Sequence, residues 1–442
     1  MKKVLVILYY WPPAGGSAVQ RWLRFCKYLP EYGWEPTVVA PENAFYTDLD
    51  KELVAEIPEK LNVLKIPIRE PHRIYKAFVG LKKEENIGAY MSMKTEPKGF
   101  ARIKNDLSVW IRSNLFIPDA RIFWIRPVTR FLKKYLASHT FDAIVTTGPP
   151  HSIHLIGLKL KASTTIPWVA DFRDPWTSTD LHAALKLTRY AEKKHIRLES
   201  KVIRAADHII AIGNDMKNEF LKIGAENITV ITNGYDESDI PAEYTEKDRK
   251  FSIVHLGTLP VTRNSSALWK VLSEKVATDK QFAKDLSIHL IGTVDYKVVQ
   301  EIEALNIKDY LSITQFVKHN EGMEILRRSA VLLLLINRSK NARGVVTGKI
   351  FEYMAVRRPV LLIGPVDGDA AAIIRETECG LCAEFDDEQM IRTLIDHYYN
   401  LFQKNELEAR PGKVSQYSRK SLAATLAQLL DKLQGDISNQ VN

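Results

Sequence analysis

The chain has 442 residues, of which 45% are hydrophobic and 26% are charged, and its formal net charge is +9. This length exceeds one ordinary hydrophobic core and predicts two or three domains of a folded globular protein. No apolar run approaches about eighteen residues, so a membrane-spanning helix is not expected. Only three cysteines are present, which argues against a disulfide framework and favours a reducing compartment, the cytoplasm.

The N-terminal part begins with a predicted buried strand over residues 4–10 and a helix over residues 18–29. Between them lies the loop Pro12-Pro13-Ala14-Gly15-Gly16. Gly15 and Gly16 would let the backbone approach a ligand closely, and the free N–H groups of the following helix would attract an anion. The loop is neither a dinucleotide-binding nor a Walker sequence, and an ordinary tight turn explains it equally well.

Residues 73–134 carry an unusual positive charge. They contain fourteen Lys and Arg against five Asp and Glu, an excess that equals the net charge of the whole chain. Aromatic residues such as Trp110, Phe123 and Trp124 are interleaved with these cations. The pattern suits an anionic membrane surface or a phosphorylated substrate, whereas no recognised nucleic-acid module is present. A solvated charged face is the alternative interpretation.

Two further predicted strands, over residues 142–146 and 167–170, end in polar residues. The second is followed by Asp171-Phe-Arg173-Asp174-Pro-Trp, and His151 follows the first. Charges at the end of a buried strand are costly unless they are paired or used. Asp171, Asp174 and His151 are therefore candidate catalytic residues, with Arg173 held by the two carboxylates to bind an oxyanion. A structural ion-pair network is the alternative.

Alternating strands and helices continue to the end of the chain. Strands are predicted over 37–40, 208–212 and 228–231, then over 251–256, 286–291, 311–313, 330–336, 360–363 and 380–384. The turn Asn233-Gly-Tyr-Asp and a polar stretch separate the two sets. We therefore predict two α/β domains with doubly wound parallel sheets, over residues 1–235 and 236–412, and a C-terminal helical stretch over 413–442. The Cys379-x-x-Cys382 spacing falls on an apolar strand pattern, so packing is expected there and no metal site is predicted.

The second domain carries several candidate anion-binding residues. Gly257 and Arg263 follow one strand, and a Gly-rich turn precedes Asp369 at the start of a helix. Thr347 can cap a helix whose first turn holds Lys349, with Glu352 three residues on. A cation at the positive end of a helix makes sense if an anion binds there, although a surface Lys–Glu pair is the simpler interpretation of this spacing. Because ligands of parallel sheets bind at the carboxyl ends of the strands, these features together favour a phosphorylated ligand.

The chain resembles family 4 glycosyltransferases of the GT-B fold, and within them the subgroup of cell-surface polysaccharide biosynthesis. Five segments spread over nearly the whole chain carry this resemblance: Tyr9-Tyr-Trp-Pro-Pro-Ala-Gly-Gly16, Asp171-Phe-Arg-Asp-Pro-Trp176, Asn233-Gly-Tyr-Asp236, His255-Leu-Gly-Thr-Leu259 and Lys349-Ile-Phe-Glu-Tyr353. The resemblance implies two Rossmann-like domains facing a cleft, with the acceptor on the N-terminal domain and the nucleotide-sugar donor on the C-terminal one. It also implies that the last helix crosses back onto the first domain.

The resemblance assigns roles to single residues. It implies that Glu352 holds the donor ribose, that Arg263 and Lys349 face the diphosphate, and that the Gly15-Gly16 loop approaches the donor. Many members carry a second Glu eight positions earlier, near the sugar, but Gly344 stands there in this chain. Many members also place a His where this chain offers Asp171 or Arg173.

The expected activity is a transfer with retention of anomeric configuration, from a nucleotide sugar to a hydroxyl of a glycan or lipid-linked glycan. The resemblance implies that neither a metal nor a cofactor is needed, since the nucleotide sugar is a substrate. Peripheral attachment to the inner face of a membrane through residues 73–134 fits this activity. A nucleotide-sugar epimerase of the same architecture and a non-catalytic membrane-associated scaffold are the alternatives.

Overall fold

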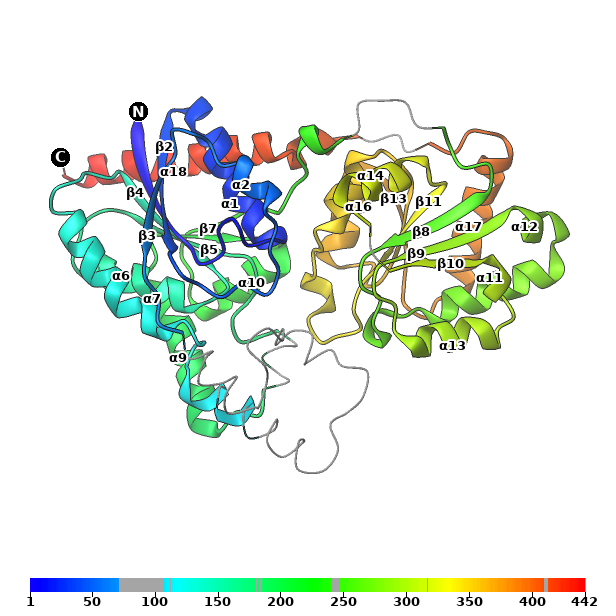
Figure 1. Cartoon of the computed structure of the whole chain (residues 1–442), viewed down its shortest axis with the longest axis horizontal. Coiled ribbons are helices and arrows are strands. Elements are labelled where there is room, and N and C mark those ends of the chain that lie inside the picture. Colours follow the sequence, from blue (N-terminus) through cyan, green and yellow to red (C-terminus); the bar gives the residue numbers. More distant parts are fainter. Residues whose placement is uncertain are drawn as a thin grey trace. The chain divides into compact units, whose positions relative to one another are not determined.

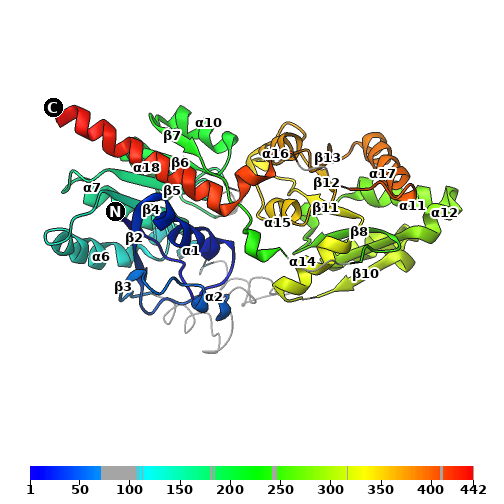
Figure 2. The ribbon, with the colours of Figure 1, turned by 90° about the horizontal axis from the view of Figure 1, so that it is seen from above.

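A computed structural model describes residues 1–70, 107–179, 182, 185–240, 246–315, 317–408 and 412–441, apart from residues 108 and 112. The described chain forms two compact units (Figures 1 and 2). Unit 1 comprises Met1–Ile231 and Leu422–Asn442, and unit 2 comprises Thr232–Ser421. Most of the basic segment, residues 73–106, lies outside the described residues, as do residues 108 and 112.

Unit 1 is built on a parallel sheet. In its described residues the sheet has seven strands in the order β3-β2-β1-β4-β5-β6-β7. These strands are β1 (Lys2–Ile7), β2 (Trp34–Pro41), β3 (Asn62–Ile66), β4 (Ala143–Gly148), β5 (Trp168–Phe172), β6 (His208–Ala211) and β7 (Ile228–Val230). Strand order reverses between β1 and β4, which is the switch point of a doubly wound sheet.

Helices cover both faces of this sheet (Figure 2). One apolar core contains residues of α1 (Ser17–Tyr28) and α18 (Arg419–Val441), among them Trp22, Leu426 and Leu430. The other core contains residues of α6 (Ile122–Tyr135), α7 (Ser152–Lys161), α9 (Arg189–Ala205) and α10 (Asn214–Ile223). A short helix, α2 (Glu52–Ala55), precedes β3. From Leu422 onward α18 is therefore part of unit 1, because its apolar face fills that core.

Unit 2 repeats this architecture with a six-stranded parallel sheet in its described residues, in the order β10-β9-β8-β11-β12-β13. The strands are β8 (Phe251–Leu256), β9 (Leu286–Ile291), β10 (Leu311–Thr314), β11 (Val331–Leu335), β12 (Val360–Ile363) and β13 (Gly380–Ala383). One core includes residues of α11 (Ser266–Thr278), α12 (Lys280–Asp285), α13 (Tyr296–Ala304) and α17 (Glu388–Gln403). The other includes residues of α14 (His319–Arg328), α15 (Lys349–Ala355) and α16 (Asp369–Thr377).

The structure confirms the prediction of two α/β domains with doubly wound parallel sheets. Every strand predicted from the apolar runs is present. Strand β3 and several helices, among them α6, α11 and α17, are additions to the prediction. Cys26, Cys379 and Cys382 are free thiols. In the described part of the chain, no helix is long and apolar enough to cross a membrane.

Candidate functional site

The carboxyl end of β8 in unit 2 brings a glycine and a lysine into direct contact. Gly257 follows the strand with a φ of +121°, a conformation that side chains rarely adopt. Lys349, the first residue of α15, lies over it: a Cβ added to Gly257 would come within 2.2 Å of Lys349 Cε and 2.5 Å of Nζ. A side chain at position 257 would displace the end of the Lys349 side chain, so both residues belong to one site at this strand end.

Arg263 completes a pair of cations at this site. Its Nε donates to Asn337 Oδ1 at 2.8 Å, and its Nη1 donates to the carbonyl of Thr258 at 2.9 Å, so the guanidinium has a fixed direction. Burial lowers the pKa of Arg263. Burial also lowers the pKa of Lys349 to about 8, with a further decrease from the charge of Arg263 and a partial increase from Glu352. Among the described residues, neither cation has a carboxylate within ion-pairing distance.

Two residues with buried polar groups lie against these cations. His255 donates through Nδ1 to the carbonyl of Leu333 at 3.0 Å, and its buried Nε2 has no hydrogen-bond partner in the described residues. Burial first, and then the charge of Lys349, lowers the pKa of His255 to about 3. The hydroxyl of Tyr353 accepts from the amide of Leu256 at 3.1 Å, which ties α15 to the end of β8. Neither residue was identified as functional from the sequence.

The remaining residues of unit 2 that were predicted to bind the nucleotide-sugar donor lie at or near the starts of helices. The hydroxyl of Thr347 accepts from the amide of Lys349 at 3.1 Å, so Thr347 does support the start of α15. Glu352 lies on the same short helix and influences the pKa of Lys349. Asp369 is buried at the first residue of α16. Gly344 ends the short 3-10 helix Ala342–Gly344 and supplies no side chain where a sugar-contacting carboxylate was expected.

Gly292, at the end of β9, was missed by the sequence analysis. It has a φ of +119°, and a Cβ there would lie 2.7 Å from the carbonyl carbon and oxygen of Gly257. The two glycines pack against each other, and this close approach sets the position of the loop under Lys349. The signal was present in the sequence, because Ile291-Gly292-Thr293 repeats the pattern of Leu256-Gly257-Thr258.

Replacing Gly257 by alanine should therefore weaken nucleotide-sugar binding by about tenfold or more, since the methyl group would displace the Lys349 ammonium and remove a charge-assisted contact. Calorimetric titration with the nucleotide sugar would measure this. Gly348→Ala is the matched control, because a Cβ at Gly348 meets nothing within 4 Å. Equal affinities of the two variants would contradict the assignment.

In unit 1 the Gly15-Gly16 loop opens the N-terminus of α1. Gly16 precedes the helix with a φ of +87°, and a Cβ there would meet nothing within 4 Å. The first turn of α1 contains no acidic residue, and its N-cap residue, Gly16, supplies no capping side chain. This end of α1 thus keeps the features that favour an anion.

The contacts of Asp171 differ from its predicted pairing with Arg173. It is 0% exposed, and its carboxylate accepts from Arg21 Nη2 at 2.9 Å, Trp22 Nε1 at 2.7 Å and the Thr147 hydroxyl at 2.8 Å. The predicted partner of this carboxylate was Arg173, but Arg21 of α1 holds that place. The carboxylate of Asp171 therefore has a hydrogen-bond donor at each oxygen and links α1 to β5. This arrangement fits the alternative of a structural ion pair.

Arg173 and His151 do lie close together at this edge of unit 1. The side chain of Arg173 donates to the carbonyl of Pro149, and its buried Nε has no partner in the described residues. His151 stacks on Trp176 with ring centroids 5.0 Å apart. Burial first, then His154 and Arg173, lowers the pKa of His151 well below its usual value. Asp174 is exposed beside them and forms no ion pair with Arg173.

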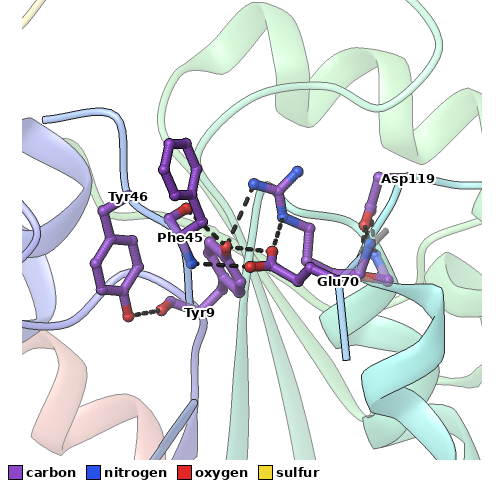
Figure 3. A network of polar contacts seen from close by, with 7 residues as sticks. Tyr9, Phe45, Tyr46, Glu70 and Asp119 are labelled. Carbon is purple, nitrogen blue, oxygen red and sulfur yellow. Dashed lines mark hydrogen bonds and ion pairs between the residues drawn. The ribbon is translucent and has the colours of Figure 1, made fainter. Parts of the chain in front are cut away.

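A second polar network at this edge was not predicted from the sequence (Figure 3). Tyr9 donates to Glu70 Oε1 at 2.6 Å, the amide of Phe45 donates to Glu70 Oε2 at 2.8 Å, and Tyr46 donates to the carbonyl of Tyr9 at 3.0 Å. Arg121, just before α6, places its Nε 3.4 Å from Glu70 Oε1 and its guanidinium 4.6 Å from the Tyr9 ring. The network ties β1, the residues after β2 and β3, and the start of α6 together.

In the part of the chain that the structure describes, no group of three or more His, Cys, Asp or Glu side chains is placed to bind a metal ion. The chemistry available at the unit 2 site is therefore that of its cations. Two half-buried cations that form no ion pair with a described carboxylate, beside glycine backbone, form a place for a diphosphate or another compact anion.

Comparison with known proteins was made on sequence and on structure. Residues 94–239 match the model of Glycosyltransferase Family 4, and no curated protein matches the chain. Sucrose-phosphate synthase from Thermosynechococcus elongatus superposes with a TM-score of 0.60 at 11% identity, covering 99% of this chain and 100% of that one. An Anabaena protein, HepE in complex with UDP-glucose, gives 0.54 at 13% identity, covering 100% and 99%.

A third structure, S. aureus TarM in a complex containing UDP, gives a TM-score of 0.55 at 12% identity, covering 97% of this chain and 100% of that one. At these identities the structural similarity shows the fold alone. The family match and the fold together support a glycosyltransferase of the GT-B type. The resemblance to family 4 glycosyltransferases of the GT-B fold is thus confirmed: this chain has the GT-B fold, and its residues 94–239 match Glycosyltransferase Family 4.

Proposed function

We propose that this protein transfers a sugar, with retention of anomeric configuration, from a nucleotide-sugar donor bound by unit 2 to a hydroxyl group of a glycan or lipid-linked glycan bound by unit 1. The observation that carries the proposal is the contact of Lys349 with Gly257 beside the fixed guanidinium of Arg263. Two adjacent half-buried cations with no carboxylate in ion-pairing distance among the described residues are unfavourable until an anion arrives, and the donor diphosphate is such an anion. HepE and TarM, whose structures contain UDP-glucose and UDP, support this choice of ligand.

The proposed reaction breaks the bond between the anomeric carbon and the diphosphate oxygen. The acceptor hydroxyl forms the new bond on the face that the diphosphate leaves, and its proton passes to the departing phosphate oxygen. Arg263 and Lys349 stabilise the negative charge that develops on that oxygen, which is electrostatic stabilisation of a leaving group. Neither a metal nor a cofactor is required by this scheme.

The acceptor would meet the edge of unit 1 that carries His151 and Arg173. Burial keeps the imidazole of His151 neutral, so it can accept a hydrogen bond from the attacking hydroxyl. Arg173 lies with its guanidinium carbon 5.9 Å from the ring centre of Tyr10, which is half-buried. A sugar ring packed on Tyr10 and held by Arg173 fits this arrangement. A role in cell-surface polysaccharide assembly follows from the family resemblance.

Screening UDP-, GDP- and ADP-sugars by thermal shift tests the proposal. One class of nucleotide sugar should raise the melting temperature, because a ligand that binds only the folded state stabilises it. No shift with any donor would contradict the proposed function. Incubating the active donor alone separates transfer from epimerisation: an epimerase would convert it without an acceptor.

Donor binding should also take up a proton near pH 8. Below that pH Lys349 is charged and meets the diphosphate as a cation; above it the free amine must first gain a proton, so affinity should fall as the pH rises. At pH 8, titration calorimetry in buffers of different ionisation enthalpy should report about half a proton bound per donor. Lys349→Arg should abolish this uptake, since arginine remains charged at this pH. A binding enthalpy of the unmodified protein that does not depend on the buffer would argue against Lys349 as the diphosphate ligand.

A further inference from the structure

Helix α6 of unit 1 presents a continuous face of cations and aromatic rings to solvent. Phe123 is 49% exposed and Phe131 is 39% exposed. Arg126, Pro127, Arg130, Lys133 and Lys134 are exposed as well, and at 3.6 residues per turn all seven positions fall within about 160° of the helix circumference. The opposite face is buried in the core through Trp124, Ile125, Val128, Thr129 and Leu132. We call the seven exposed positions the α6 face.

The charges of the α6 face are all of one sign. The helix contains no Asp or Glu, and none of its four exposed cations has an ion-pair partner among the described residues. Arg126 and Arg130 are four residues apart, as are Arg130 and Lys134, and like charges at this spacing repel each other. An isolated protein gains nothing from this arrangement, whereas an anionic partner would relieve the repulsion.

Apolar side chains extend the face beyond the helix. Leu107, Trp110 and Leu115, in the described residues that precede α6, are 46%, 40% and 63% exposed. Phe116 makes an edge-to-face contact with Phe123, with ring centroids 5.7 Å apart, which connects this stretch to the α6 face. Exposed aromatic and aliphatic residues that gather beside cations mark an interaction surface, because solvent-exposed positions rarely concentrate them.

The start of α6 is held rigidly. Asp119 accepts from both the amide and the hydroxyl of Ser152 at 2.8 Å, and Arg121 lies against Glu70. Arg121 is therefore used inside unit 1 and is not part of the exposed face. The helix offers a preformed surface, so docking need not order it first.

We propose that the α6 face docks on an anionic phospholipid bilayer, with the helix lying in the plane of the headgroups. Four cations suit phosphate headgroups, and Phe123, Phe131 and Trp110 suit the boundary between headgroups and acyl chains. Residues 71–106 of the same chain are not a complementary occupant, because they contain eight Lys and Arg against four Asp and Glu. This inference does not depend on the proposed glycosyl transfer, although it would place unit 1 beside a lipid-linked acceptor.

The test is co-sedimentation of the full chain with vesicles of phosphatidylcholine alone and with about one third phosphatidylglycerol. Binding is expected only with the anionic vesicles and should weaken as salt is raised. Replacing Arg126, Arg130, Lys133 and Lys134 together by Gln should lower the vesicle affinity several-hundredfold, at about fivefold for each charge. The double variant Phe123→Ala and Phe131→Ala, which keeps every charge, should lose on the order of tenfold.

The matched control makes the same change of net charge on unit 2, by replacing the exposed Lys280, Lys284, Lys297 and Lys404 with Gln. This unit 2 variant should keep most of the affinity for anionic vesicles. Equal losses in the two quadruple variants, equal binding to neutral vesicles, or no vesicle binding would each overturn the proposal. So would displacement of bound vesicles by a single-stranded oligonucleotide, because it would identify nucleic acid as the preferred partner. The thermal shift with the donor should persist in the α6 variant, so loss of docking can be distinguished from failure of the proposed function.

Discussion

Replacing Lys349 by alanine should lower the turnover of sugar transfer by about tenfold to a thousandfold, as loss of a single oxyanion donor does in other enzymes. The ammonium lies over Gly257, where the donor diphosphate is expected to bind. Because negative charge increases on the diphosphate as the glycosidic bond breaks, kcat should fall more than KM rises. Steady-state kinetics with the donor identified by thermal shift would measure both constants.

Two variants make this prediction specific. Lys340→Ala removes an exposed lysine nine residues earlier and should leave turnover within about twofold. Arg263→Ala should act in the same direction as Lys349→Ala, since Arg263 faces the same anion. If both Lys349→Ala and Arg263→Ala left the transfer rate within about twofold of the unmodified protein, the assignment of the diphosphate site would be wrong.

Acidification should unfold this protein at a mild pH. His154 and His255 have their pKa lowered to about 3 by burial, and His195 to about 4. In the unfolded chain each titrates near 6.5, so below that pH the unfolded state binds more protons than the folded state and stability falls. Between pH 7.5 and pH 5 each histidine should remove about 2 kcal/mol of unfolding free energy. In unit 1, His154 and His195 together would then remove about 4 kcal/mol, a large part of ordinary domain stability, and His151 and His208, whose pKa burial also lowers, add to this loss.

Urea unfolding at a series of pH values would measure this loss. The indole of Trp176 donates to Nδ1 of His195 at 3.1 Å, so His195 must accept there and stay neutral. A glutamine at position 195 can still accept but cannot titrate, so His195→Gln should reduce the loss for unit 1 by about 2 kcal/mol. His139→Gln, which changes an exposed histidine of the same unit, should not alter it. An unfolding free energy that stays within about 1 kcal/mol over this pH range would refute the prediction.

Most of the fold could be predicted from local patterns. Apolar runs such as 251–256 and 360–363 are long and uninterrupted because the strands of a parallel sheet are buried on both faces. Strand β3 was missed because it is half-exposed and its residues alternate less clearly. Helix α6 was missed although its buried positions recur at helical spacing: residues 73–134 were interpreted by their charge, and Pro127, which usually breaks a helix, lies inside it.

The unit 2 site was largely foreseeable and the unit 1 site was not. Gly257, Arg263 and Lys349 each stand just after a strand or at a helix start, and the carboxyl ends of parallel strands share one edge, so their proximity follows from the fold class. Asp171 also stands at a strand end, yet its partner is Arg21 rather than Arg173. The partner lies 150 positions away in the sequence, and no local pattern specifies such a pair.

By itself, the sequence determined the alternation of strands and helices, the positions of the polar residues at the strand ends and the resemblance to a glycosyltransferase family. These properties depend on periodicity and on short segments, which act over a few residues. Only the tertiary structure decided which charges neutralise one another: Asp171 pairs with Arg21, whereas Lys349 and Arg263 form no ion pair with a carboxylate among the described residues. The reason is physical, because the state of a buried charge depends on the groups that packing brings within a few ångströms, and those groups come from distant parts of the chain.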